Sequence, residues 1–532
     1  MDKQPASPQE KTTFKQKLDK FFQISARGSN FKTEIIAGLT TFFAMAYIVV
    51  TNPDQVVGFK AFKGNEEVDK IWYAVYIASI LVAVIGTLLY AFYAKMPFAQ
   101  ACGMGLNSFF FVSFVAPELT SGSPLKGYKE GLAIILVSGI LFMILSFTGL
   151  RATIAKALPE NLKKAVSAGI GLFIAFLGLQ NIGIVQRNRY TLVQLFDFNG
   201  IIQANGKTLG ELAELNALPD PQISDAVYNA YLSHFNYDFT ATVTPLDAWR
   251  LIAPVILTIV ALCVIGILAK KKVRGGVVFT ILGTTALYYL STWQAPEFDL
   301  SHIPNSFKYF GTEGLFGAFE GFGTLFVREG NENLFGLILS AIMLVITFTL
   351  VDMFDTIGTL YGAASQANML DEKGDPVNLN KSMNSDSIAT LTGAVLGTST
   401  CTTFVESSAG VGVGGRTGFS SLITAGCFFL CLFLTPVATI IPACATAPVL
   451  IYIGVLMLKN FAHVDMEDIT SAIPAFLTLV MMPLTYSISN GIAVGAISYV
   501  LIRLFTGKYQ KKDITITIIA ALFILRFFFI SM

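Results

Sequence analysis

Three carboxylates and one amide lie inside apolar stretches of the sequence, where folding rarely needs such groups. Asp352 and Asp355 occur in LVDMFDTIGTLYG, and their i, i+3 spacing places both on one face of a helix. Glu406 lies between the extended-looking TSTCTTF and a glycine-rich stretch, and Asn107 lies in ACGMGLNSFFFV. An ionisable group at membrane depth is costly and is a functional-site candidate by default. These four residues are therefore the candidates for binding a polar ligand or carrying a proton.

Each candidate also has a structural explanation. Asp352 could hydrogen-bond between helices, and Asp355 could hold backbone donors of a neighbouring segment. Glu406 could favour the start of a short helix through the helix dipole. Asn107 could satisfy local backbone groups. The position of Glu406 at an interruption of the apolar pattern makes it the best site candidate in the chain.

Other polar and aromatic residues near these stretches have simpler interpretations. Phe98 and Phe404 flank the two interrupted stretches, and one or both could stack on a planar ring. Asp386 and Glu34 lie near expected helix starts, where we predict capping. Arg416 is expected to anchor the chain at the membrane surface.

The composition places these residues in a membrane protein. Of 532 residues, 54% are hydrophobic and 13% are charged, whereas a soluble protein has about one quarter charged residues. Lys and Arg number 36 against 35 Asp and Glu, so there is no basic excess to bind nucleic acid. The composition predicts a polytopic membrane protein with lipid around it.

The cysteines and histidines predict neither a metal site nor a cofactor. None of the six cysteines forms a CxxC pair, which argues against zinc and against a disulfide framework. The three histidines fall in polar connecting segments. We therefore expect no metal ligand and no histidine proton relay at membrane depth.

About fifteen hydrophobic peaks approach the length of about 20 residues that a spanning helix needs, and the number of true spans could be fourteen. Basic residues mark the cytoplasmic side. They cluster in the N-terminal tail (1–32), in Arg151–Lys164 and in Lys270–Arg274. The N-terminus is thus predicted to be cytoplasmic in a plasma membrane, with loops 186–247 and 294–333 outside.

Two of the peaks are interrupted by glycine and polar residues: Pro97–Pro117 and Gly397–Gly418. The β-branched residues of Thr398–Phe404 predict extended backbone in the second. Each is the third element of its half if the second half begins near residue 335, and an odd number of spans per half inverts the second half. Paired broken segments in corresponding positions indicate a transporter binding site.

The stretches 30–53, 101–112, 350–362 and 382–418 resemble the nucleobase–cation symporters, in particular the AzgA-like branch of adenine, guanine and hypoxanthine permeases. The resemblance implies an all-α fold of fourteen segments in two inverted repeats of seven, with short strands in segments 3 and 10. Segments 1–4 and 8–11 would form a core domain, and segments 5–7 and 12–14 a gate domain. The expected divisions are a tail (1–32), a first repeat (33–293), an outer loop (294–333) and a second repeat (334–532).

The resemblance also implies which residues contact the substrate. It implies that Asp352 and Glu406 contact the nucleobase and that Asn107 takes part in binding. With less support, it extends to the backbone near Phe404 and Val405. Uracil permeases carry a histidine where this chain has Thr356, so the histidine-containing site does not transfer.

The sequence as a whole predicts proton-coupled uptake of a purine nucleobase by alternating access, and no enzyme activity. Glu406, Asp352 and Asp355 are the candidates for carrying the proton. An anion exchanger of the same fold is the first alternative, although central acids disfavour an anion. A membrane-embedded enzyme is the second, and no catalytic motif supports it. A homodimer is compatible with the sequence.

Overall fold

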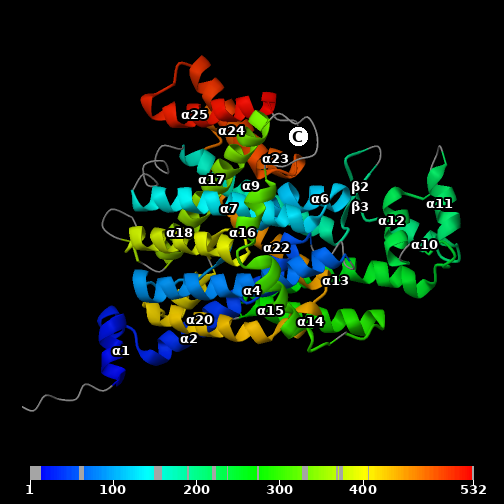
Figure 1. Ribbon diagram of the computed structural model, residues 1–532, viewed down its shortest axis with the longest axis horizontal. Coiled ribbons are helices and arrows are strands. Elements are labelled where there is room, and N and C mark those ends of the chain that lie inside the picture. Colours follow the sequence, from blue (N-terminus) through cyan, green and yellow to red (C-terminus); the bar gives the residue numbers. More distant parts are fainter. Residues whose placement is uncertain are drawn as a thin grey trace, which may run out of the picture.

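Long apolar helices lying side by side account for most of the chain (Figure 1). Seven helices among the described residues are long and apolar enough to cross a membrane, and six shorter apolar helices accompany them. The computed structural model describes residues 14–58, 65–148, 159–188, 191–218, 223–235, 238–271, 273, 275–296, 298–325, 334–366, 369–370, 376–404 and 406–529.

The first half of the chain contains membrane segments 1 to 7, and segment 3 begins with a short strand instead of a helix. Before it lie the short helices α1 (Phe14–Phe22) and η1 (Ser25–Arg27). The segments are α2 (Phe31–Met45) with α3 (Ile48–Val56), α4 (Glu66–Leu89) with η2 (Tyr90–Ala94), β1 (Gln100–Cys102) with α5 (Met104–Phe110), η3 (Phe111–Val115) and α6 (Ala116–Ser121), α7 (Pro124–Phe147), α9 (Glu160–Asn181), α13 (Pro245–Lys270) and α14 (Gly276–Thr292).

The second half repeats this order as segments 8 to 14, and a further apolar helix, α25 (Ile514–Phe529), follows them. Segment 10 again begins with a strand. The segments are α17 (Leu334–Gln366), α18 (Leu379–Leu396), β4 (Cys401–Thr403) with α19 (Ser407–Gly412), α20 (Gly418–Leu430) with η5 (Cys431–Phe433) and α21 (Thr435–Thr439), α22 (Ala443–Leu458) with η6 (Lys459–His463), α23 (Ile469–Leu484) and α24 (Ile488–Phe505).

The packing of the helices confirms the two repeats. Where two segments pack on each other, the two segments that stand seven places away from them along the chain also pack on each other. Thus α2 packs on α20 as α17 packs on α7, and α4 packs on α20 as α18 packs on α7. In the same way α13 packs on α22 as α23 packs on α9, and α13 on α14 as α23 on α24. The first two pairs lie within the core domain and the last two within the gate domain.

The strands of the two broken segments meet at the centre of the core domain. β1 and β4 pair antiparallel, with Cys102 opposite Cys401 and Gln100 opposite Thr403. An antiparallel pair between corresponding segments is what inverted repeats require. Gly397 ends α18 with a φ of +97°, which a residue with a side chain rarely adopts, so the chain can turn directly into the second broken segment.

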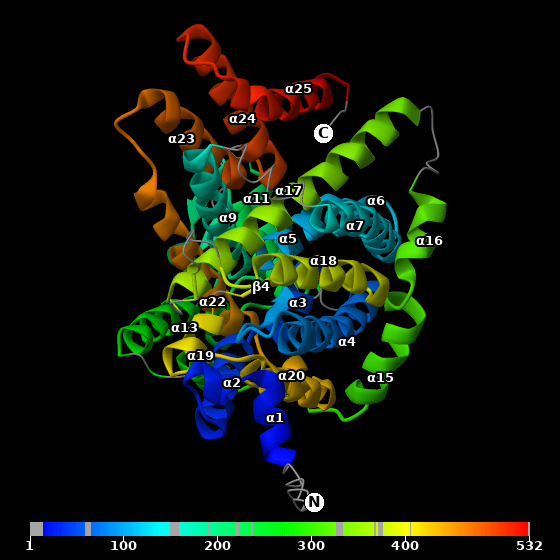
Figure 2. The same cartoon turned by 90° about the vertical axis from the view of Figure 1, so that its left-hand side faces the viewer.

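The two long loops are folded. The loop after α9 forms the hairpin β2 (Val185–Arg187) and β3 (Val193–Leu195), and the helices α10 (Phe198–Gln203), α11 (Leu209–Ala217) and α12 (Asp225–His234) pack around their own apolar cluster. The loop before segment 8 forms α15 (His302–Tyr309), η4 (Phe310–Gly314) and α16 (Gly317–Thr324). These helices run along α4 and α7 of the core domain (Figure 2).

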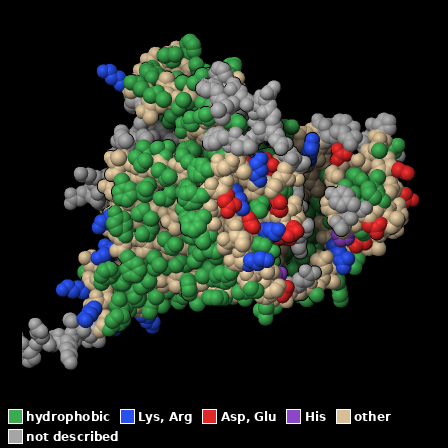
Figure 3. Space-filling model, in the orientation of Figure 1, with side chains coloured by type: hydrophobic (Ala, Val, Ile, Leu, Met, Phe, Trp, Pro, Cys, Tyr) green, Lys and Arg blue, Asp and Glu red, His purple; other side chains and the backbone are tan. Residues whose placement is uncertain are grey.

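The surface agrees with a membrane setting. A broad band of hydrophobic side chains crosses the molecule, and charged side chains gather on both sides of it (Figure 3). In the same orientation, α1 and the lobe of α10–α12 lie at opposite ends (Figure 1). Residues 151–158, 272 and 274 of the two basic segments lie outside the described residues, and the cytoplasmic position of the N-terminus stays a prediction.

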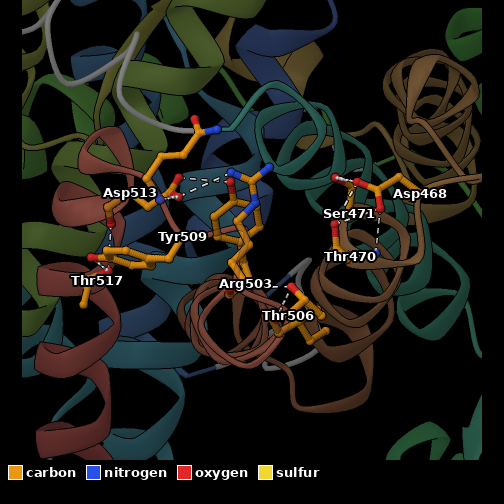
Figure 4. A network of polar contacts seen from close by, with 11 residues as sticks. Asp468, Thr470, Ser471, Arg503, Thr506, Tyr509, Asp513 and Thr517 are labelled. Carbon is orange, nitrogen blue, oxygen red and sulfur yellow. Dashed lines mark hydrogen bonds and ion pairs between the residues drawn. The ribbon is translucent and has the colours of Figure 1, made fainter.

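A buried ion pair joins the last helices (Figure 4). Arg503 Nη1 on α24 lies 3.3 Å from Asp513 Oδ2, and the Tyr499 hydroxyl donates to Asp513 Oδ1 at 3.2 Å. Asp513 is only 2% exposed. The pair fixes the turn between α24 and α25, because a buried carboxylate needs a partner.

Candidate substrate site between the two strands

Hydrogen bonds between the two broken segments continue beyond the paired residues of β1 and β4. The Phe404 N–H donates to the Ala99 carbonyl at 3.1 Å, and the Gly103 N–H donates to the Thr400 carbonyl at 2.9 Å. The Ser407 hydroxyl accepts from the Ala99 N–H at 3.0 Å. The backbone of both breaks is thereby satisfied within the protein, as a membrane interior demands.

Glu406 lies where β4 passes into α19 and is half-buried. The Tyr47 hydroxyl, from the junction of α2 and α3, donates to Glu406 Oε1 at 2.7 Å. Glu406 makes no capping hydrogen bond to α19, which is only six residues long. A helix-capping role therefore does not explain this carboxylate.

Asp355 approaches the same place from α17 and is half-buried. A Cβ atom added to Gly103 would lie 3.2 Å from Thr402 Cγ2 and 3.6 Å from Asp355 Oδ2. The absence of a side chain at Gly103 thus lets α17 and the two strands come together. Asp355 and Glu406 are close enough to interact electrostatically.

Asp352 faces a different neighbourhood from Asp355. Its side chain is 1% exposed, and Oδ2 accepts from the Thr390 hydroxyl of α18 at 3.0 Å. Thr390 Oγ1 also lies 3.0 Å from the Cys401 carbonyl and accepts from the Cys401 N–H at 3.1 Å. Asp352 therefore sits where α17, α18 and β4 join.

Asn107 belongs to a fully buried network of side-chain amides and hydroxyls. Its amide donates to Asn52 Oδ1 and to Gln55 Oε1, the latter at 3.2 Å. Its oxygen accepts from the Ser399 hydroxyl. The network joins α3, α5 and the start of the second broken segment, and these partners of Asn107 include none of the three carboxylates.

The aromatic candidates differ in their surroundings. Phe98 is fully buried and meets Tyr90 edge-on at 5.9 Å, within an apolar cluster that includes Met96 and Leu360. Phe404 is 7% exposed and directly precedes the Glu406 turn. Val405 lies outside the described residues.

The structure corrects the interpretation of Asp386. α18 begins at Leu379, so Asp386 lies in the helix interior and is not a cap. It is fully buried, and its carboxylate accepts from Gln100 Nε2 at 3.1 Å and from the Thr356 hydroxyl at 2.6 Å. The polar sequence at the start of α18 hid this buried acid of the core.

Sequence reasoning also missed two tyrosines of the site. Tyr47 contacts Glu406 directly, and Tyr452 of α22 lies within its electrostatic reach from the gate domain. Tyr47 lies in the stretch 30–53 that carries the resemblance, but neither tyrosine is polar enough to stand out from the apolar residues around it. Among the described residues, no three His, Cys, Asp or Glu side chains gather closely enough to hold a metal ion.

A cavity of about 670 Å³ lies elsewhere, where the lobe of α10–α12 meets the end of α9 and the turn before α24. Gln180, Arg187, Asp225 and Tyr486 are among its lining residues, and none of the predicted site residues lines it.

The chain is similar to known permeases over most of its length. A family model described as "Permease family" matches residues 32–206 and 223–494. A putative permease of Methanocaldococcus jannaschii is 33% identical over 97% of this chain and 99% of its own length. The adenine permease AdeP of Escherichia coli is 32% identical over 97% and 96%. The guanine/hypoxanthine permease PbuG of Bacillus subtilis is 33% identical over 96% and 99%.

Solved structures show the same fold at low identity. The transmembrane domain of the cyanobacterial bicarbonate transporter BicA superposes with a TM-score of 0.52 at 15% identity, covering 87% of this chain and 97% of that one. SLC26A9 superposes with a TM-score of 0.53 at 12% identity, covering 94% and 70%.

Proposed function

Because this chain belongs to the permease family, we propose that it takes up purine nucleobases across the plasma membrane in symport with protons. Its relatives include adenine permeases and guanine/hypoxanthine permeases that match nearly the whole chain. The resemblance noted in the sequence is thereby confirmed at the level of the family. The purine substrate, the coupling to protons and the cytoplasmic position of the N-terminus are all parts of this proposal.

One observation carries the choice of substrate. Two carboxylates lie beside the paired strands: Asp355 Oδ2 would be 3.6 Å from a Cβ atom at Gly103, next to β1, and Glu406 lies between β4 and α19. A purine has N–H donors at its edge, and a carboxylate accepts from them in charge-assisted hydrogen bonds that are stronger than neutral ones. Phe404 lies next to Glu406 and could cover a flat face of the ring.

The other candidates support this site in our proposal. Asn107 fixes the first broken segment through its buried amide network. Asp352, which the resemblance assigns to the base, is bonded to Thr390 and lies against β4, so we assign the contact on α17 to Asp355. Phe98 packs beneath the first strand. We propose that the backbone near Val405 contacts the edge of the base.

Proton coupling follows from the same pair of acids. Two neighbouring carboxylates withdrawn from water hold one proton more readily than two isolated ones. Binding of a base that donates to one carboxylate then changes where the proton resides. Tyr452 on the gate helix α22 lies near Glu406, so movement of the core domain against the gate domain would alter access to the acids.

The anion exchanger remains the second candidate because BicA is a bicarbonate transporter and shares the fold. At about 15% identity, that likeness carries the fold and nothing about the substrate. A site for an anion is expected to present basic groups or helix N-termini, whereas Glu406 and Asp355 present negative charge. The acids therefore favour the purine.

Uptake of radiolabelled hypoxanthine into cells that lack their own purine permeases tests this proposal. We expect uptake that a proton uncoupler abolishes and that unlabelled purines, but not uracil, compete for. Glu406→Gln should abolish uptake while the protein stays in the membrane. Glu160→Gln makes the same chemical change at a 76% exposed side chain and should leave uptake intact. Transport of labelled bicarbonate without purine uptake would select the anion exchanger.

A further inference from the structure

Helices α17 and α18 carry two Asp–Thr pairs in reciprocal arrangement. Asp352 and Thr356 stand four residues apart on α17, and Asp386 and Thr390 stand four residues apart on α18. Thr390 donates to Asp352 at 3.0 Å, and Thr356 donates to Asp386 at 2.6 Å. Each helix thus supplies one acid and one hydroxyl. We call these four residues the clamp.

Each half of the clamp reaches one of the two strands. Thr390 Oγ1 accepts from the Cys401 N–H in β4 at 3.1 Å and lies 3.0 Å from the Cys401 carbonyl. Asp386 accepts from the side chain of Gln100 in β1 at 3.1 Å. Gln100 and Cys401 stand at opposite ends of the pairing register, so the clamp touches the strand pair at both ends.

The clamp is buried from end to end. Asp352 is 1% exposed, and the other three residues are 0% exposed. Buried carboxylates of this kind are stable only with hydrogen-bond partners. Asp355 lies on the same helix, directly before Thr356, but it is half-buried and belongs to the site. Of the two acids of α17, Asp352 therefore supports the strands and Asp355 belongs to the site.

We propose that the clamp positions the two strands and thereby sets the affinity of the site for the base, without touching the base itself. This inference rests on the proposed purine transport. The clamp couples α17 and α18 to one strand from each repeat. Glu406 directly follows β4, and Asp355 projects from α17, so the separation of these carboxylates depends on the clamp.

Removing one hydroxyl at a time tests the proposal. Thr356→Val and Thr390→Val keep the shape of the side chain and delete the donor, whereas Thr356→Ser and Thr390→Ser keep the donor. We expect each valine variant to bind labelled hypoxanthine about tenfold more weakly in purified protein, since a hydrogen bond to a charged group is lost. The serine variants should bind close to wild type.

A measurement that needs no ligand tests the clamp independently of the proposed function. Cys102 and Cys401 face each other across the strands and are buried, whereas Cys263 is exposed. Alkylation by N-ethylmaleimide, mapped by mass spectrometry, should be faster at both strand cysteines in the valine variants and unchanged at Cys263. If wild-type protein binds no purine, the proposed function fails, and this readout still tests the clamp.

Thr392→Val is the matched control. Among the described residues, its hydroxyl donates to the Ile388 carbonyl of its own helix α18, at 2.7 Å. It should change neither affinity nor alkylation. Valine variants of the clamp that bind and alkylate like wild type would overturn the proposal. So would a shift in the pH dependence of uptake, because that result would place the clamp on the proton path.

Discussion

The hydrogen bond between Tyr47 and Glu406 allows a sharp test of the site. Tyr47→Phe removes one hydroxyl that donates to Glu406 Oε1 at 2.7 Å and leaves the ring in place. Tyr47 is only 3% exposed, so the ring is held by its packing. A carboxylate has room for several donors, and Tyr47 engages only one oxygen, which leaves the other for the base. The hydroxyl therefore orients Glu406 without competing with the substrate.

The expected size of the effect follows from the burial of the pair. A hydrogen bond to a charged group contributes about 1.5–3 kcal/mol. Glu406 is half-buried, so water can replace part of the lost donor, and the lower value applies. Since about 1.4 kcal/mol corresponds to a tenfold change, we expect the dissociation constant for the base to rise about tenfold.

The assay is equilibrium binding of labelled hypoxanthine to purified protein, with uptake kinetics in parallel. Tyr76→Phe is the control, because its buried hydroxyl donates to the neutral Cys431 carbonyl at 2.7 Å. It should lower thermal stability without changing affinity. An unchanged or tighter dissociation constant in Tyr47→Phe would refute the orientation of Glu406 by Tyr47.

Three further outcomes follow from contacts away from the two acids. Gly105→Ala should block uptake while purine binding persists, because the new methyl group would lie 2.4 Å from Ile170 of the gate helix α9 and would obstruct the proposed movement of the two domains; normal uptake would refute this contact. Asn107→Ala should lower the free energy of unfolding by about 1–3 kcal/mol, as buried partners lose their bonds, and a melting curve equal to wild type would count against the network. Arg503→Ala should lower the melting temperature, with a loss of about 3 kcal/mol for stranding the buried Asp513, and should leave purine affinity unchanged.

Much of the fold could be predicted because membrane physics leaves few options. Apolar length identifies the spans, and backbone that is broken at membrane depth must be satisfied inside the protein. Pro97–Pro117 and Gly397–Gly418 could therefore be recognised as special before their strands were seen. The pairing register could not, because it depends on contacts between segments about 300 residues apart.

The candidate site was predictable in its residue types more than in its geometry. The i, i+3 spacing puts Asp352 and Asp355 on one helix face, yet a face is wide enough for the two side chains to meet different neighbours. Only the packing of α17 on α18 separates them, with Thr390 beside Asp352 and Gly103 beside Asp355. Asp386 was hidden for the same reason, since its partners lie on other segments.

The fold that this chain shares with BicA leaves the substrate open, so in our proposal the central charges decide it. Two short helices, α5 and α19, start beside the paired strands, and helix starts favour negative charge. Left alone, such a centre would suit an anion. In this chain Glu406 and Asp355 already supply negative charge there, and Tyr47 stabilises one of them. In our proposal a neutral ring with N–H donors satisfies these acids, whereas an anion would be repelled, so two side chains on a shared fold would decide the class of substrate.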